Sequence, residues 1–570
     1  MPSIKQIDEP VKSYPGIKEA FHQNAKEYFN NLLKEGNVNL ENNKSTCQEY
    51  YTKLTEVEAM KKKVAKTNRK KNWFTFLMVL CCITIVLIPI GIFVIRKHIK
   101  ETVNKAIEEL NNKVKELEQK AEELKEEAIK QTALLNSMYD WNMPASLFNK
   151  TIPLVEMDTN FNVERFQLLK ERYGFVEHMD GDISTVFVQS GAINGNPFVI
   201  EKNYVQEMGP FTYTGTLVIH YVTYERDHEG HTHAVHHTQT LVASLVKPKP
   251  FYYLDTWLVY GNAAAPKLSF TRNPTNASKL DGKDLKRFVT KTEKKLDKME
   301  KKNTGFTQML DAKFEGLFNA LDRDNEVEFR LLFTPLAQSN MMSLITMKEP
   351  YGDDFCFYKQ KQLNYIKTAH AQGFDYSANP LMFIDFDASR AKETFLNYCD
   401  NYFQNVFFDL APIISIPLYQ NYKERNYVYK DNHHESRHTM FEVESLANAY
   451  DKELFKPKGS VTDNILKARF VKRDGKFDIY NIESFGFRTV RHVTPVPTLG
   501  GDGHMHPVPV VWYEYIPVKG LTGFKVEEMN TTRQKFNDAF KNVSGNTNSL
   551  NVYYQKGIAS TILQSKLKEN

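Results

Sequence analysis

The sequence predicts an α+β protein with N-terminal helices, one transmembrane helix, a coiled-coil stalk and a large mixed α+β C-terminal region. Three observations support this fold class. Residues 74–95 form an uncharged apolar run, residues 103–128 repeat apolar side chains in steps of four and three, and the remaining chain groups strand-like and helix-like segments in blocks. Blocks favour an α+β architecture, because a doubly wound sheet would alternate strands and helices.

The size and charge of the chain limit its class. Its 570 residues exceed the roughly 250–300 at which one hydrophobic core usually stops growing, so more than one domain is expected. The net charge is only +5, because 74 basic residues nearly balance 69 acidic ones. Such a balance gives no global positive field, and we therefore expect no nucleic-acid partner.

Residues 1–72 predict a short helical N-terminal region. Two polar helices are separated by residues 36–44, which contain Gly36 and several asparagines. The apolar positions in this region are few: Phe21, Tyr28, Phe29, Leu32 and Leu33. A region this small is expected to act in docking or as a spacer rather than in chemistry.

Residues 73–96 predict a transmembrane helix. The uncharged run over residues 74–95 would form a helix of roughly 33 Å at about 1.5 Å per residue, and a hydrocarbon core is about 30 Å thick. Trp73 fits the interfacial position at one end. Because the run starts too far from Met1 for a cleaved signal peptide, it is interpreted as a signal anchor of a single-pass protein.

The charges beside this run predict an orientation in the cell membrane. Seven basic residues precede the run and four follow it within a similar distance. The basic residues before the run are Lys61, Lys62, Lys63, Lys66, Arg69, Lys70 and Lys71. By the positive-inside rule, the N-terminus is expected in the cytoplasm and the C-terminal region outside the cell.

Residues 97–137 predict a coiled-coil stalk. The apolar positions with heptad spacing are Val103, Ile107, Leu110, Val114, Leu117, Ala121, Leu124 and Ala128. This spacing is typical of a left-handed coiled coil, and a parallel homodimer is the first expectation. One alternative is a single amphipathic helix docked on the globular part of the same chain. A helix over residues 46–71 is another candidate partner, although a single span would place it across the membrane.

Residues 138–280 predict a β-rich domain. Residues 211–225 and 235–246 alternate in polarity and are rich in β-branched and aromatic side chains, with residues 227–230 as a glycine-containing turn. This pattern is typical of a β-hairpin. A further strand is expected over residues 251–260.

Residues 281–570 predict an α+β domain, which follows a polar stretch over residues 274–284. The expected helices cover residues 285–301, 306–321 and 336–345, and the expected strands cover residues 326–333, 427–429, 468–473 and 477–482. A second hairpin is expected around residues 500–503, where three of four residues are glycine.

Two glycine turns are each followed by a His-x-His pair. The four residues are His231, His233, His504 and His506. Residues i and i+2 of a strand project from one face, so neighbouring hairpins could offer four imidazoles to zinc, copper or nickel, with zinc as the main candidate. A turn closing on residues 227–230 would also set His220 opposite His237. The alternative is that histidine is simply a tolerated polar residue near turns.

A second metal hypothesis concerns His434, Glu435 and His438, which match the spacing of a zinc-protease helix. Two features argue against it. Arg437 occupies an intervening position that is normally uncharged, and the preceding residues predict a strand and a turn. A solvated polar loop is the alternative interpretation.

The apolar segment over residues 381–387 ends in Asp385-Phe386-Asp387, an arrangement that can hold a divalent cation at a strand end. The simpler interpretation is that Asp387 caps a helix that begins at Ala388.

The motifs do not predict an enzyme. The sequence contains no dinucleotide-binding GxGxxG, no phosphate-binding GxxxxGK[ST] and no GxSxG. The leading hypothesis is therefore a membrane-anchored, stalked interaction protein for an unknown protein or envelope partner. The competing hypothesis is a membrane-anchored, metal-dependent hydrolase that uses one of the histidine clusters.

Overall fold

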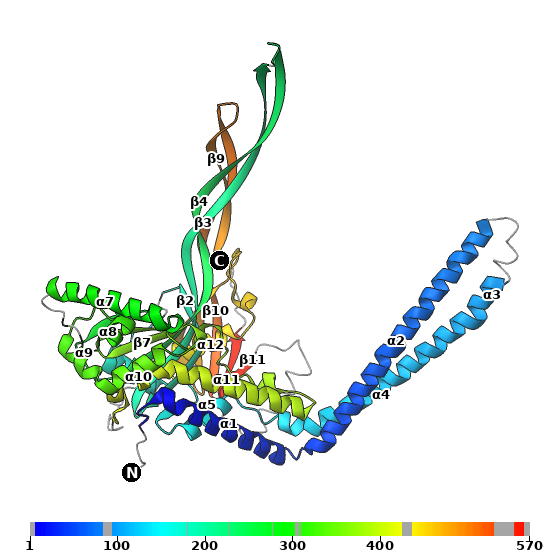
Figure 1. The fold of residues 1–570 in the computed structure, drawn as a ribbon. Coiled ribbons are helices and arrows are strands. Elements are labelled where there is room, and N and C mark those ends of the chain that lie inside the picture. Colours follow the sequence, from blue (N-terminus) through cyan, green and yellow to red (C-terminus); the bar gives the residue numbers. More distant parts are fainter. Residues whose placement is uncertain are drawn as a thin grey trace.

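The structure is a computed structural model that describes most of the chain. The described residues are 6–83, 94–178, 180–226, 228–275, 277–302, 307, 309, 311–423, 436–528 and 552–563. They form a mixed α+β body with two antiparallel sheets, which confirms the predicted α+β class. A helical hairpin and a pair of long β-hairpins project from this body in different directions (Figure 1).

The larger sheet has seven strands in the order β1-β2-β3-β4-β7-β6-β5. The strands are β1 (Val155–Met157), β2 (Ile183–Ile193), β3 (Asn196–Arg226), β4 (Thr232–Gly261), β5 (Ser269–Arg272), β6 (Phe355–Gln360) and β7 (Leu363–Thr368). All neighbours in this sheet are antiparallel. β5 pairs with β6, although the polar stretch over residues 274–284 separates them in sequence.

The helices of the body pack with this sheet around one large aromatic core. They are α1 (Pro10–Glu35), α5 (Met143–Thr151), α6 (Val163–Gln167), α7 (Gly282–Lys302), α8 (Ala312–Phe318), α9 (Glu326–Leu332), α10 (Pro335–Ile345) and α11 (Ala388–Ile414). α11 is the central helix, because every residue from Val406 to Ile414 is buried. α1 packs against it, with the rings of Phe21 and Phe403 4.5 Å apart. The N-terminal region is thus docked on the body.

The smaller sheet has five strands in the order β11-β12-β10-β9-β8. Its strands are β8 (Ile465–Asp474), β9 (Phe477–Leu499), β10 (Met505–Glu528), β11 (Val552–Gln555) and β12 (Ile558–Leu563). The expected strands over residues 468–473 and 477–482 and the hairpin around residues 500–503 are confirmed. The short helix α12 (Met440–Asn448) contacts both sheets. The expected strand over residues 427–429 lies outside the described residues.

The outer parts of the β3–β4 and β9–β10 hairpins stack on each other, and we call this projection the β arm (Figure 1). Their facing sides bury a small core of Ile219, Leu241, Ala243, Val508 and Val510. The predicted hairpin over residues 211–246 is confirmed, but both strands are much longer than expected. They continue into the body sheet, where the first residues of β3 are buried on both faces.

The register of the β3–β4 hairpin differs from the prediction by one residue. Arg226 pairs with Thr232, so the loop has five residues instead of four. Tyr221 therefore lies opposite His237, whereas His220 lies opposite Thr238. The prediction that His220 faces His237 is wrong, because one additional loop residue shifts every pair along the hairpin.

Several helix predictions are confirmed, and one strand prediction is wrong. α7 and α10 match the helices expected over residues 285–301 and 336–345, while α8 is shorter than the helix expected over residues 306–321. Instead of a strand over residues 326–333, the chain forms helix α9 (Glu326–Leu332). The side chain of Asn325 accepts a hydrogen bond from the backbone N–H of Glu328, which caps the first turn.

The helical hairpin consists of α2 (Leu40–Ile83) and α4 (Asn104–Asn136), with the short helix α3 (Arg96–His98) and a π-helical turn (Ile99–Val103) before α4. The two long helices lie side by side (Figure 1). Every predicted heptad position of α4 is buried or half-buried. The side of α4 that was expected to mediate association therefore faces α2 of the same chain.

This arrangement corrects the prediction of a single-pass transmembrane signal anchor. No helix within the described residues is long and apolar enough to cross a membrane. α2 ends at Ile83, and residues 84–93 lie outside the described ranges. Lys61 Nζ lies 2.7 Å from Glu118 Oε1, whereas a single span would place these residues on opposite sides of a bilayer. The sequence pattern misled because an uncharged apolar run shows only that apolar side chains follow one another, not whether they cross a bilayer.

Candidate functional site

The structure places the two His-x-His pairs at different positions along the β arm. The Gly501 N–H donates to Gln239 Oε1 at 2.7 Å, so the β9–β10 loop lies beside the Ile219–Gln239 pair of the β3–β4 hairpin. Gly501 lies close to Tyr221, because a Cβ added to Gly501 would touch the Tyr221 side chain. His233 pairs with Glu225, which is four residues further toward the tip of the hairpin than Tyr221. Four strand residues span about 13 Å. The structure therefore does not bring His231 and His233 together with the other pair.

In the second pair, both histidines contact an aspartate of the same loop region. His506 Nε2 lies 2.9 Å from Asp502 Oδ2, within the same β9–β10 loop region, and the N–H of His504 donates to Asp502. Across the described ranges, no group of three histidine, cysteine, aspartate or glutamate side chains is arranged to hold a metal ion. Zinc binding by these histidines therefore gains no geometric support.

The protease-like motif is only partly described. His434 and Glu435 lie outside the described residues, whereas His438 is buried and forms an isolated bridge with Asn162. Residues 436–439 are not helical, because Thr439 is the N-cap at which α12 begins. Burial lowers the pKa of His438. The backbone at His438 thus lacks the helix that the zinc-protease arrangement requires.

Asp387 caps helix α11, as the simpler interpretation predicted. Its side chain accepts hydrogen bonds from the backbone N–H groups of Ser389 and Arg390 at 2.9 and 3.4 Å. The preceding apolar residues form a short 3₁₀ helix (Pro380–Phe383) and not a strand. The Asp387 carboxylate therefore caps the first turn of α11.

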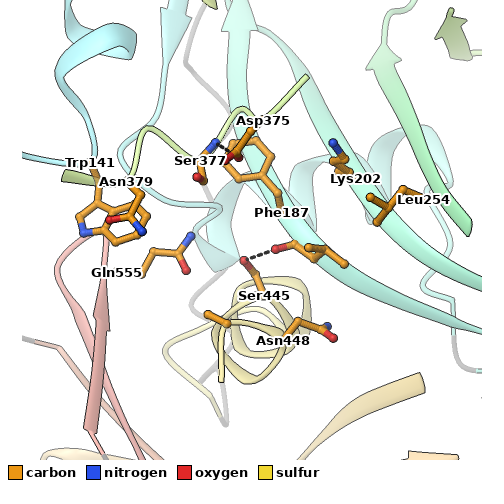
Figure 2. Close-up of a pocket in the computed structure, with 12 residues that line it drawn as sticks. Trp141, Phe187, Lys202, Leu254, Asp375, Ser377, Asn379, Ser445, Asn448 and Gln555 are labelled. Carbon is orange, nitrogen blue, oxygen red and sulfur yellow. Dashed lines mark hydrogen bonds between the residues drawn. The ribbon is translucent and has the colours of Figure 1, made fainter. Parts of the chain in front are cut away.

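A cavity of about 400 Å³ lies where the two sheets meet, and we call it the junction cavity (Figure 2). Its lining comes from β2, β3, β4, the loop before the 3₁₀ helix, α12, β11 and the segment after α4. The lining residues are Trp141, Val186, Phe187, Lys202, Leu254, Asp375, Ser377, Asn379, Ser445, Asn448, Ala449 and Gln555. Sequence reasoning missed this site because no two of its polar side chains belong to a recognisable motif.

The polar groups of the junction cavity are held by the backbone around them. Lys202 Nζ donates to the carbonyl oxygen of Phe374 at 2.6 Å, and burial lowers the pKa of this lysine. Asp375 accepts from the N–H of Ser377 at 2.9 Å. In Figure 2, Trp141 and Asn379 lie at one side of the view and Lys202 at the other, with Gln555 and Ser377 between them.

Helix α12 forms one wall of the cavity and is fixed by buried ion pairs. Glu444 lies 2.9 Å from Lys467 Nζ and accepts from the N–H of Thr185, so it links α12 to both sheets. On the same helix, the Ser445 hydroxyl donates to the carbonyl of Val186 at 2.9 Å. Near Glu444, burial raises the pKa of Glu201 to about 7. These contacts hold Ser445 at a fixed place in the wall.

The loop that carries Asp375 and Ser377 is held by a buried histidine. His370 Nδ1 lies 2.5 Å from Asp354 Oδ2, and its Nε2 lies 3.3 Å from Asp409 Oδ1. Burial by itself lowers the pKa of His370, but the hydrogen bonds to the two carboxylates outweigh it and raise the pKa to about 10. His370 is therefore a cation that ties this loop to α11.

The end of the helical hairpin combines exposed apolar side chains with basic ones. The apolar side chains, which we call the hairpin end, are Trp73, Phe76, Val79, Leu80 and Val94. Trp73 is 59% exposed and Phe76 is 64% exposed. Basic residues that we call the basic collar lie next to them in sequence on both helices: Arg69, Lys70, Lys71, Arg96, Lys97 and Lys100. The rings of Phe74 and His98 lie 5.2 Å apart, which places the two halves of the collar side by side.

Comparisons with protein-family models, with curated proteins and with solved structures found no match for this chain.

Proposed function

We propose that this protein is an interaction protein that docks on an anionic lipid surface through the hairpin end and presents its α+β body to a protein or envelope partner. The observation that carries the proposal is the set of exposed apolar side chains beside the basic collar. Large apolar side chains gathered in one place on a surface are typical of a protein or membrane contact.

The energetics of the hairpin end favour a lipid surface. Fully burying a large apolar side chain is worth about 1.5–3 kcal/mol, and the five side chains of the hairpin end are half-exposed or more. Each lysine or arginine near an anionic membrane adds about 1 kcal/mol. Tryptophan beside basic residues also suits the boundary between headgroups and acyl chains. Apolar insertion and charge attraction therefore act in the same direction.

The hairpin would act as a spacer between that surface and the body. α4 has 33 residues, which corresponds to a length of about 50 Å. Its buried contacts with α2 include Val114, Ala121 and Ala128, so the two helices support each other along this length. The body and the β arm would be held at a distance from the lipid, where a partner could reach them.

Flotation of the full-length protein with vesicles tests the proposal. We expect binding to vesicles that contain phosphatidylserine and weaker binding to vesicles of phosphatidylcholine alone. The double variant Trp73→Glu/Phe76→Glu should lower the vesicle partition coefficient by more than about a hundredfold, because two apolar contributions of about 1.5–3 kcal/mol are lost.

Val327→Glu/Leu331→Glu provides a matched control, because both residues are well-exposed apolar side chains on α9. This control should partition as the unchanged protein does. The proposal fails if the unchanged protein does not float with either vesicle, or if both double variants lose binding equally.

A further inference from the structure

The junction cavity has the size of a small-molecule site. Its volume of about 400 Å³ lies within the range of roughly 300–1,000 Å³ that is usual for ligand pockets. It forms where the two sheets, α12 and the segment after α4 meet. Neither the hairpin end nor the β arm contributes to its lining.

Neutral hydrogen-bonding side chains dominate its polar lining. They are Ser377, Asn379, Ser445, Asn448 and Gln555. Hydroxyl and amide groups both donate and accept hydrogen bonds, so the capacity that remains beside the bond from Ser445 to Val186 matches a ligand that carries several hydroxyl groups. A ligand with only acceptors, such as a phosphate, would use such a lining poorly.

The charged groups of the cavity balance each other. Among the described residues of the lining, Lys202 is the only lysine or arginine and Asp375 the only carboxylate. The Lys202 ammonium group is already engaged by the Phe374 carbonyl, and burial lowers its pKa. Anionic ligands are usually held by several cationic donors. The cavity is therefore better suited to a ligand without net charge.

Trp141 adds an aromatic surface to the lining (Figure 2). The face of an indole ring is electron-rich and attracts the weakly positive C–H groups of a saturated ring, while neighbouring polar groups bind its hydroxyls. A sugar ring presents both kinds of surface. Asp375, which is exposed at the rim, offers carboxylate oxygens that can accept from two hydroxyl groups.

We infer that the junction cavity binds a neutral, polyhydroxylated molecule of the size of a mono- or disaccharide. Trp141 packs against the C–H face of the sugar. Asp375 and the amide side chains bind the hydroxyl groups. This inference does not depend on docking of the hairpin end on lipid.

Titration calorimetry on the full-length protein tests the inference. The probes are glucose, galactose, N-acetylglucosamine and maltose, with glycine and inorganic phosphate as ligands of other chemistry. We expect at least one sugar to bind. Trp141→Ala should weaken that binding by about tenfold or more through the lost ring contact, whereas Trp141→Phe should retain most of it. Asp375→Asn should weaken it severalfold, because a charged acceptor is replaced by a neutral one.

Trp512→Ala is the matched control, because Trp512 lies on the β arm, where its ring stacks on His492. Its sugar affinity should match that of the unchanged protein. The melting temperature of each variant distinguishes loss of the binding site from loss of folding. If Trp141→Ala does not fold, Asp375→Asn provides the test of the binding site. The inference is overturned if no sugar binds, if only glycine or phosphate binds, or if folded Trp141→Ala and Asp375→Asn bind sugar as tightly as the unchanged protein.

Discussion

The β arm and the helical hairpin, the two projections of the molecule, bury their apolar side chains in different ways. In the β arm, two hairpins face each other and bury Ile219, Leu241 and Val510 between them, and the loop of the shorter hairpin is polar around Asp502 and His506. In the helical hairpin, α2 and α4 cover each other along their length but leave Trp73 and Phe76 exposed at the end. Exposed apolar side chains remain on the outer face of the β arm as well, among them Val218, Val222 and Val242, so what distinguishes the helical hairpin is the basic collar beside its exposed side chains.

The largest expected effect concerns the contact between α2 and α4. Ala128→Glu would place a charge at a position that is fully buried against α2. Burying an unpaired carboxylate costs several kcal/mol, so we expect tryptic cleavage within α4 to become about a hundredfold faster. Cleavage can be followed by mass spectrometry under native conditions.

Ala133→Glu is the control for this prediction, because Ala133 is exposed on the same helix. Its cleavage rate should stay close to that of the unchanged protein. Equal cleavage of both variants would mean that α2 and α4 do not protect each other in solution.

A smaller effect is expected in the core of the β arm. Leu241 is buried between the two hairpins, and Leu241→Ala should destabilise the arm by about 2–4 kcal/mol through lost burial and a cavity. Amide hydrogen exchange in β4 and β10 should become faster together, because each hairpin covers the other. Val242→Ala, on the exposed outer face, should change exchange little. Faster exchange in β4 alone would contradict stacking of the hairpins.

A further effect, about 1.4 kcal/mol for each pH unit, should distinguish the body from both projections. The pKa of His370 is raised to about 10 in the folded body, above the unfolded value of about 6.5. Its stabilising contribution is therefore complete below pH 6.5 and is lost as the pH rises through 10. Urea unfolding at pH 7 and pH 9 should show this loss, and His370→Gln should remove it. Hydrogen exchange in the β arm should not follow the same pH dependence, because His370 lies in the body.

Local signals predicted several elements well. The turn around residues 500–503 and the alternation in the strands that flank residues 227–231 predicted both hairpins, because these patterns act between close neighbours in the chain. The spacing of Phe288, Leu296 and Met299 in α7 and the capping by Asp387 are equally local. The helix α9 was missed because its apolar residues are dense enough to suit a strand, while the capping by Asn325 decides the outcome.

The candidate sites depended far less on local pattern. A shared metal site was predicted from the spacing of the histidine pairs. The two pairs lie apart along the β arm because the β3–β4 hairpin extends further than the β9–β10 hairpin. The junction cavity assembles Trp141, Lys202 and Gln555 from segments that lie far apart in the sequence. No periodicity links such residues.

The sequence by itself determined the α+β class, the long apolar run, the heptad pattern of α4 and the two long β-hairpins, because each depends on side chains that are near neighbours in the chain. The tertiary structure alone decided that α4 packs on α2, that the two β-hairpins stack, and that a cavity forms between the sheets. An apolar face specifies that it must be covered but not by which segment, and only the folded chain selects the partner that covers it.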